Sequence, residues 1–268
     1  MFLDLREKMN LKNKGYNKIL KRKLSLLEYI RFFMFFICLV TFVISSFIII
    51  KRLVEYRENK KVYNEMRVYS PEVMKDNESN KRGFLEEDFK KLKDINSDIK
   101  AWITIPNTEV NYPITQGINN EYYLNHNFKK EKNNGGSILI EYDNKTPFNK
   151  GNTVIHGHNM KDGSMFADLL KFKEENFFNN NNKIYITLEN EVIEYEIFSI
   201  YVEELDKEHY NNQFYYNGDY IRYLNDLKSK SIFNSNVELK SDKDIITLST
   251  CDFSIHDGRL IIHAIRNN

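Results

Sequence analysis

Near its C-terminal end the chain reads Ile245-Ile246-Thr247-Leu248-Ser249-Thr250-Cys251, followed after a short loop by Arg259-Leu260-Ile261-Ile262-His263-Ala264-Ile265. Both runs are rich in apolar and β-branched residues, which predicts two strands. The loop between them ends in Asp257-Gly258, a pair that favours a turn. If the strands pair antiparallel, Cys251 and Arg259 lie side by side where the hairpin meets its loop.

Cys251 is a candidate nucleophile because of this neighbour. A fixed cation such as the Arg259 guanidinium favours the thiolate, which is the form of cysteine that attacks. A charged donor here also suits the oxyanion formed by attack on a carbonyl, and losing one such donor typically costs about 3 kcal/mol. The hairpin therefore predicts covalent catalysis by a thiol.

A histidine after another predicted strand is the candidate base. The stretch Asn152-Thr153-Val154-Ile155-His156-Gly157-His158-Asn159-Met160 reads as a short strand running into a glycine, with His158 just past the strand end. A histidine held by a sheet yet reachable by solvent suits proton transfer near neutral pH. His156 lies nominally on the same face, so spacing alone does not choose between the two.

One apolar segment predicts a membrane anchor. Residues 32–50 carry no charge, and a helix of this length rises about 28 Å, close to the ~30 Å hydrocarbon core of a bilayer. Residues 1–31 hold nine Lys/Arg against three Asp/Glu, which places the N-terminus inside and the later residues outside. A cleavable signal peptide is the alternative; the long basic leader and the lack of a small-residue cleavage site favour an uncleaved anchor.

The composition of the exported part limits its function. Residues 32–268 carry thirty Lys/Arg against thirty-five Asp/Glu, a balance that is not typical of nucleic-acid binding. Cys38 falls within the apolar segment, where a small apolar filler is expected. Cys251 is then the only exported cysteine, so no intrachain disulfide can form there.

The chain is expected to have four regions: a basic cytoplasmic N-terminus (1–31), the anchor (32–50), a charged linker that can be part helical (51–83) and a catalytic domain (84–268). The domain opens with an amphipathic helix over residues 84–95. Eight apolar runs then predict a closed or nearly closed β-barrel: 101–105, 110–114, 136–141, 152–156, 183–188, 192–202, 245–250 and 259–265. Asn190-Glu191 predicts a tight hairpin between the fifth and sixth strands.

Two inserts interrupt the predicted strands. Residues 165–172 show helical spacing after His158. Residues 203–243, between the sixth and seventh strands, contain a second helical pattern at Tyr220, Ile221, Leu224 and Leu227. An insert of this length favours a functional lid or binding wall.

These motifs resemble the sortase family, the membrane-anchored cysteine transpeptidases of Gram-positive bacteria, and most closely its class B. The similarity extends in the family's order over nearly all of residues 84–266. The matching motifs are Ala101-Trp102-Ile103, Tyr112-Pro113-Ile114, Gly136-Ser137-Ile138, the Gly157-His158-Asn159-Met160 segment through Phe166, Thr247 to Cys251 and Arg259 to Ile262.

The resemblance implies an eight-stranded sortase barrel with Cys251 as nucleophile, His158 as its proton partner and Arg259 as the substrate-orienting, charge-stabilising residue. Such enzymes cleave a sorting signal of a secreted protein after its threonine and form a thioacyl enzyme. An amine of peptidoglycan or of its lipid-linked precursor, or a pilin lysine, then resolves it. Class B members commonly prefer Asn-Pro-x-Thr-x or related signals and often anchor iron- or haem-uptake proteins. The chemistry requires no metal or cofactor.

Several residues near the motifs allow two interpretations, one functional and one structural. Class B often has tyrosine where this chain has His156, which is expected to pack or modulate while His158 is the base. Ser249 and Thr250 are candidates for substrate binding. Asp252 or Asp257 could orient His158, although loop aspartates commonly form turns. His256 could touch substrate, and Trp102 is expected in the core.

Three alternatives to the cell-wall transpeptidase stay open at this point. The first is a membrane-tethered binding domain without turnover, which gives no chemical reason for keeping Cys251, His158 and Arg259 together. The second is a hydrolytic cysteine peptidase, which shares the acyl-enzyme step and differs only in the access of water against amine. The third is a pilin-polymerising sortase, which differs only in its acceptor.

Overall fold

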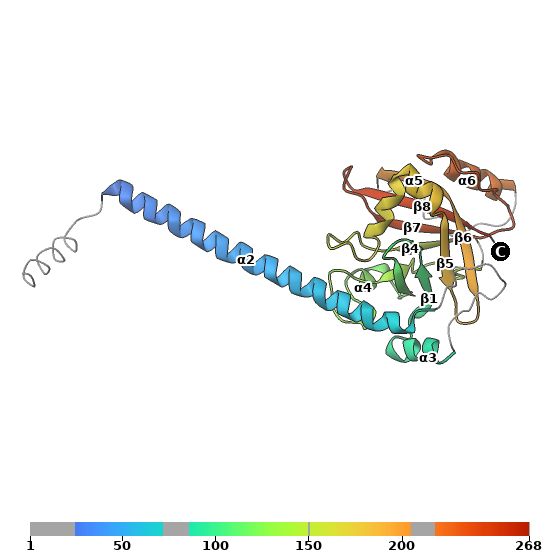
Figure 1. Ribbon diagram of the computed structural model, residues 1–268, viewed down its shortest axis with the longest axis horizontal. Helices are drawn as coiled ribbons and strands as arrows, with labels where there is room; N and C mark the ends of the chain where they lie inside the picture. The colour runs from blue at the N-terminus through green and yellow to red at the C-terminus, as the bar shows by residue number, and fades with distance from the viewer. Residues whose placement is uncertain (1–24, 72–85, 150, 205–217, 268) are drawn as a thin grey trace, which may run out of the picture. The chain divides into compact units, whose positions relative to one another are not determined.

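The computed structural model describes residues 25–71, 86–149, 151–204 and 218–267 (Figure 1). Contacts divide the chain into two compact units, residues 1–54 and 55–268, which are described separately. The first unit contains most of helix α2 (Leu26–Met66) and with it the predicted anchor segment. Among the described residues, this one helix is long and apolar enough to cross a membrane. The expected helix is confirmed, and its membrane topology stays a prediction.

The second unit is built on a closed barrel of eight strands, as predicted (Figure 1). The strands are β1 (Ile99–Thr104), β2 (Asn111–Thr115), β3 (Ile138–Ile140), β4 (Asn152–His156), β5 (Lys183–Thr187), β6 (Val192–Glu204), β7 (Ile245–Cys251) and β8 (Gly258–Arg266). Their order around the barrel is β1-β2-β3-β4-β7-β8-β6-β5. Neighbours are antiparallel except for the parallel pairs β2–β3 and β4–β7.

Side-chain alternation along β7 separates the core from the functional face. Ile246 and Leu248 belong to the main buried cluster, together with residues such as Ile103, Ile114, Ile155, Ile186 and Ile262 from the other strands. Ile245 points the other way, into a second cluster under a helix. Because the period of a strand is two, Ser249 and Cys251 share the outward face of Ile245. The predicted nucleophile therefore lies on the outer surface of the barrel, and Trp102 is fully buried, as expected.

The region expected to be a linker begins as a continuation of the helix. Within residues 51–83 the structure describes 51–71, and α2 runs on to Met66 before a 3-10 turn, η1 (Arg67–Tyr69). Tyr63 and Met66 are each 3% exposed and belong to the main cluster of the barrel. The compact unit that holds the barrel starts at Glu55, and the division at residue 84 stays a prediction. Charged residues on the opposite face of this helical stretch make the sequence resemble a spacer.

Helix α3 (Glu86–Ile95) confirms the predicted amphipathic helix before the barrel. The connection between β2 and β3 contains a short helix, α4 (Asn120–Leu124), capped by the Asn119 side chain, which accepts from the Tyr122 amide at 2.9 Å. The Asn190-Glu191 hairpin is also confirmed, since the Leu188 amide donates to the Glu191 carbonyl at 2.8 Å.

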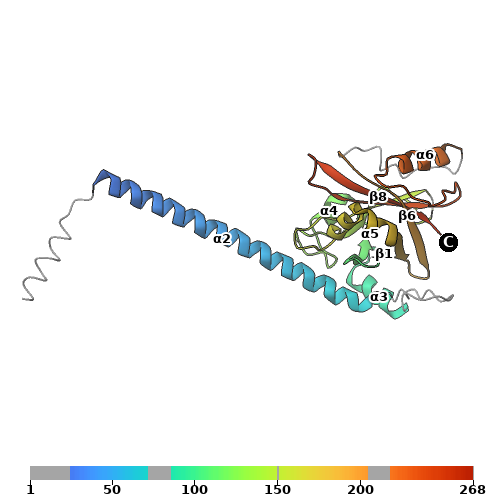
Figure 2. The ribbon, with the colours of Figure 1, turned by 45° about the horizontal axis from the view of Figure 1, so that its top comes forward.

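The two inserts differ from expectation in detail. After β4 the helical pattern predicted from residue 165 begins only at Ala167, as a 3-10 helix, η2 (Ala167–Lys173), because Met165 has a positive φ of 59°. A further helix, α5 (Glu175–Asn180), was not predicted. Helix α6 (Gly218–Ser229) confirms the second pattern and packs on the barrel's outer face, against Phe198, Ile245 and Ile265 (Figure 2). Residues 205–217, which belong to the predicted lid, lie outside the described residues.

Two glycines with positive φ make a matched test of this fold. Gly136 (φ 57°) lies where a Cβ would be 2.7 Å from the Tyr123 carbonyl oxygen and 2.8 Å from that of Leu124, whereas Gly163 (φ 82°) faces open space. We expect Gly136→Ala to lower the free energy of unfolding by about 2–4 kcal/mol and Gly163→Ala by about 1 kcal/mol, since only the first adds a backbone clash to the φ strain. Urea unfolding of the full chain in micelles, followed by Trp102 fluorescence, measures both; equal losses would contradict the packing of Gly136.

Candidate active site

An open cleft of about 620 Å³ lies on the outer face of β3, β4, β7 and β8, beside α4. Its lining includes the three predicted catalytic residues, Cys251, His158 and Arg259, and the two predicted substrate-binding residues, Ser249 and Thr250. These residues come from three separate stretches of the sequence. The barrel therefore brings these five residues together, whereas Asp252, His256 and Asp257 do not line the cleft.

Cys251 and Arg259 are paired directly across the β7–β8 hairpin. The thiol is half-buried, and the Asn159 side-chain amide donates to the Cys251 carbonyl at 2.9 Å. No pattern in the amino-acid sequence predicts this hydrogen bond between the loop that follows β4 and the end of β7. Among the described residues the Arg259 guanidinium has one hydrogen bond, to the Gly258 carbonyl at 3.1 Å, so most of its donors are open to a substrate.

His158 follows β4 and is oriented by a backbone carbonyl. Its Nε2 lies 2.8 Å from the Leu124 oxygen at the end of α4. Because a carbonyl only accepts, Nε2 carries a proton, and in the neutral ring Nδ1 is the nitrogen that can accept one. This contact fixes the tautomer in the way a catalytic base requires.

His156 is held by a carboxylate instead. Its Nε2 lies 2.5 Å from Glu141 Oε2, and the other Glu141 oxygen accepts from the Asn120 side chain. Burial raises the pKa of the Glu141 carboxyl, but the hydrogen bond and charge of His156 and the Asn120 amide outweigh it and hold that pKa below its usual value. Glu141 was not predicted as a site residue from the sequence. The only feature that could have indicated it is its position as a charged residue at the end of an otherwise apolar predicted strand.

The two aspartates considered as orienting groups are engaged elsewhere. Asp252 is 2% exposed, forms an ion pair with Lys173 at 2.8 Å and accepts from the Ser254 amide at 2.8 Å. Burial raises its pKa, while the hydrogen bonds from Lys173 and Ser254 lower it more, so it stays ionised. Asp257 is exposed, with a positive φ of 49°, and pairs with His256. Leu124, not a carboxylate, is the group that the structure places on His158 Nε2.

Lys173 has a further effect on the cleft. Its ion pair occupies one Asp252 carboxylate oxygen, and Ser254 occupies the other. The negative charge of Asp252, which directly follows Cys251, is therefore balanced by Lys173 and not by Arg259. A guanidinium that is not neutralised by a protein carboxylate remains available to an oxyanion.

Ser249 and Thr250 differ in orientation. Ser249 shares the face of Cys251 and stands opposite His156 in the sheet. Thr250 alternates to the inner face, is 2% exposed and has a hydroxyl with no hydrogen-bond partner within the described part of the chain. A contact between Thr250 and substrate would thus involve its backbone.

Helix α6, which belongs to the insert predicted as a lid or binding wall, contributes no residue to the lining of this cleft. The described ranges also hold no cluster of His, Cys, Asp or Glu suited to a metal ion.

Comparison with known proteins agrees with this arrangement. A family model described as the sortase domain matches residues 103–267. Sortase B of Listeria monocytogenes is 36% identical over 229 residues, which cover 84% of this chain and 92% of that protein.

Solved structures give the same result. Sortase B of Clostridium perfringens has a TM-score of 0.64 and 37% identity, over 67% of this chain and 100% of that one. A substrate complex of Staphylococcus aureus sortase B has a TM-score of 0.70 and 27% identity, over 80% and 98%. The chain belongs to the sortase family, and these relatives place it in class B.

Proposed function

We propose that this chain is a membrane-anchored cysteine transpeptidase that attaches secreted proteins to the cell wall. The observation that carries the proposal is the meeting of Cys251, Arg259 and His158 in one cleft on the outside of the barrel. Family membership supports sortase chemistry in general. The apolar part of α2 would hold the enzyme at the membrane, with the N-terminus in the cytoplasm and the barrel on the outer face.

The first half of the reaction forms a thioester. The Cys251 thiolate attacks the carbonyl carbon of the threonine in a signal of the Asn-Pro-x-Thr-x type, and the oxyanion accepts hydrogen bonds from Arg259. Protonated His158 gives a proton to the departing amine as the peptide C–N bond breaks. The signal's C-terminal part leaves, and the acyl group remains on sulfur.

The second half transfers the acyl group to an amine. The acceptor, an amine of peptidoglycan or its lipid-linked precursor, attacks the thioester and loses a proton to His158. The new C–N bond forms as the C–S bond breaks, which returns the thiolate. Exchange through Nδ1 is consistent with an Nε2 held by Leu124 throughout.

The reactivity of the thiol can be tested without a substrate. In a Cys38→Ala background, we expect iodoacetamide to modify Cys251 in the folded full chain in micelles, because the thiol is half-exposed in an open cleft. Mass spectrometry of the intact protein measures the adduct, and Cys251→Ser is the control. Labelling that requires denaturant would contradict a working thiol.

The two histidines are distinguished by substitution. We expect His158→Ala to lower kcat/KM by a factor on the order of 10³, because proton transfer in both halves is lost. His156→Ala should cost less than about tenfold, because His156 is committed to Glu141 and acts on the cleft's shape and charge. Steady-state kinetics on the same peptide measures both, and a larger loss for His156→Ala would transfer the role of base to His156.

The reaction itself is tested with a panel of sorting-type peptides, each with and without an acceptor amine. We expect a thioacyl adduct on Cys251, and release of a product that is cut after threonine and joined to the amine, as identified by mass spectrometry. Cys251→Ala should form no adduct. Water-cleaved product alone, despite excess amine, would instead indicate a hydrolase, and no adduct with any peptide would favour a binding domain.

A further inference from the structure

The C-terminal turns of α2 contact the barrel at a place that leads to the catalytic histidine. Tyr63 is 3% exposed, and its hydroxyl donates to the Gly136 carbonyl at 2.7 Å, just before β3. Burial raises the pKa of Tyr63 far above its usual value, so the hydroxyl keeps its proton and remains a donor. The Tyr63 hydroxyl thus holds the backbone of Gly136 in place.

Gly136 in turn touches the end of α4. Its positive φ brings it so close that a Cβ would lie 2.8 Å from the Leu124 carbonyl oxygen. The next residue strengthens this contact, since the Ser137 amide donates to the Tyr123 carbonyl at 2.8 Å. The Leu124 oxygen is the acceptor for His158 Nε2 at 2.8 Å. Two hydrogen bonds and one close backbone contact therefore join Tyr63 to the His158 ring.

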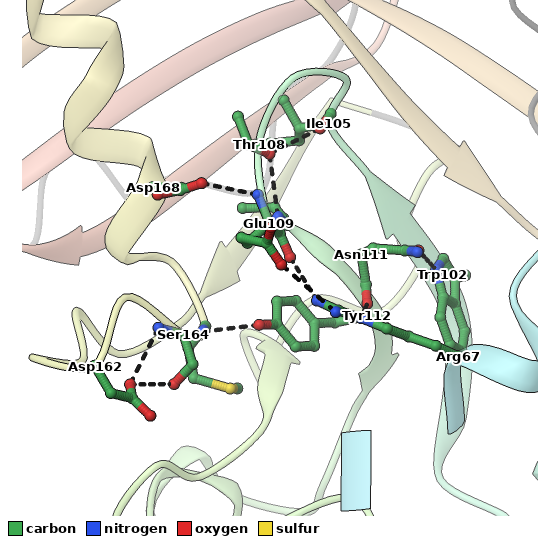
Figure 3. A network of polar contacts seen from close by, with 12 residues as sticks. Arg67, Trp102, Ile105, Thr108, Glu109, Asn111, Tyr112, Asp162, Ser164 and Asp168 are labelled. Carbon is green, nitrogen blue, oxygen red and sulfur yellow. Dashed lines mark hydrogen bonds and ion pairs between the residues drawn. The ribbon is translucent and has the colours of Figure 1, made fainter. Parts of the chain in front are cut away.

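A second set of contacts leads from the same segment to the nucleophile. The Arg67 guanidinium lies 5.3 Å from the centre of the Tyr112 ring and donates to the Glu109 carbonyl at 2.9 Å (Figure 3). The Tyr112 hydroxyl accepts from the Met165 amide at 3.1 Å. Met165 forms a β-bridge with Asn159, whose side chain holds the Cys251 carbonyl.

Tyr112 joins the two routes, since its ring also packs edge-on against Tyr63, with centroids 5.2 Å apart. Asn59, one turn earlier on α2, is 3% exposed and places its amide nitrogen 3.9 Å from the Met165 sulfur. Met165 has a positive φ, a conformation that persists only when the surroundings impose it. The segment 59–67 contributes to these surroundings directly through Asn59 and, through Tyr63 and Arg67, by contacting the Tyr112 ring whose hydroxyl holds the Met165 amide.

We propose that residues 59–67 are a positioning element for catalysis: Tyr63 sets His158 through Gly136 and Leu124, and Arg67 sets Asn159 and Cys251 through Tyr112 and Met165. The inference rests on the proposed function, because it assigns these residues to the alignment of the same base and nucleophile. Residues 59–67 belong to the same compact unit as the barrel, and they act on the site only through the residues that they position.

The test compares two conservative changes on the same helical stretch of the full chain in micelles. Tyr63→Phe removes only the hydroxyl, and Tyr56→Phe is the matched control, since Tyr56 is half-exposed and has no hydrogen bond within the described residues. We expect Tyr63→Phe to lower kcat about fivefold with KM unchanged within about twofold, because misalignment affects the chemical steps more than binding. Tyr56→Phe should leave both constants unchanged.

Two further readouts separate positioning from stability and need no sorting peptide. The ¹⁵N signals of the His158 imidazole and the pH profile of Cys251 alkylation should both change in Tyr63→Phe and not in Tyr56→Phe. Arg67→Lys keeps a cation but loses the planar fork, and it should change the alkylation profile relative to Arg57→Lys, an exposed control.

The outcomes are distinct. If no peptide is turned over by any form of the chain, the proposed function fails, while the imidazole signals and alkylation profile still decide the positioning role. Unchanged signals and profiles in Tyr63→Phe and Arg67→Lys would overturn the inference. A loss of kcat that only follows the fraction unfolded, measured by Trp102 fluorescence, would overturn it as well.

Discussion

The parallel pairing of β4 with β7 is the contact on which the cleft depends. It sets His156 opposite Ser249, and the Gly157 amide continues the ladder by donating to the Ser249 carbonyl at 3.2 Å. β7 pairs on its other side with β8, so that Cys251 faces Arg259. Because a slip of one residue sends every side chain to the opposite face, these two registers together place the Cys251 thiol and the Arg259 guanidinium in the same cleft as His158. The geometry of the site is therefore set mainly by the sheet.

The charges around the thiol are arranged so that Arg259 keeps its donors. Glu141 is paired with His156, and Asp252 is paired with Lys173, each at hydrogen-bonding distance. Both carboxylates are mostly buried, where an uncompensated charge would be costly. Each carboxylate has its partner on another element, and neither of these two ion pairs includes Arg259. Buried ion pairs of this kind do little for stability by themselves, and their role here is to define which cation faces the cleft.

Much of this molecule could be predicted from its sequence because its signals are local. The apolar runs of β7 and β8 predicted the hairpin, and the hairpin predicted that Cys251 and Arg259 lie side by side. The contacts of His158 with Leu124 and of Asn159 with Cys251 could not be predicted, since they join residues 34 and 92 positions apart without a pattern in either segment. The packing of Tyr63 against the barrel could not be predicted for a different reason. The last turns of α2 bury only a few residues, and the charged residues on their exposed face dominate the sequence pattern.

The parallel β4–β7 pair has a consequence for the order in which the cleft forms during folding. Among the described residues, three helical elements and two other strands lie between β4 and β7, so the ladder between them closes only after all of these have been made. Contacts of such large sequence separation form slowly, because the entropy of closing the loop is lost before the contact stabilises it. Cys251 is the last residue of β7, which follows β1 to β6 in the chain and is synthesised after them. A chain in which β7 and β8 have not yet been made therefore lacks the strand pairings that bring Cys251, Arg259 and His158 into one cleft.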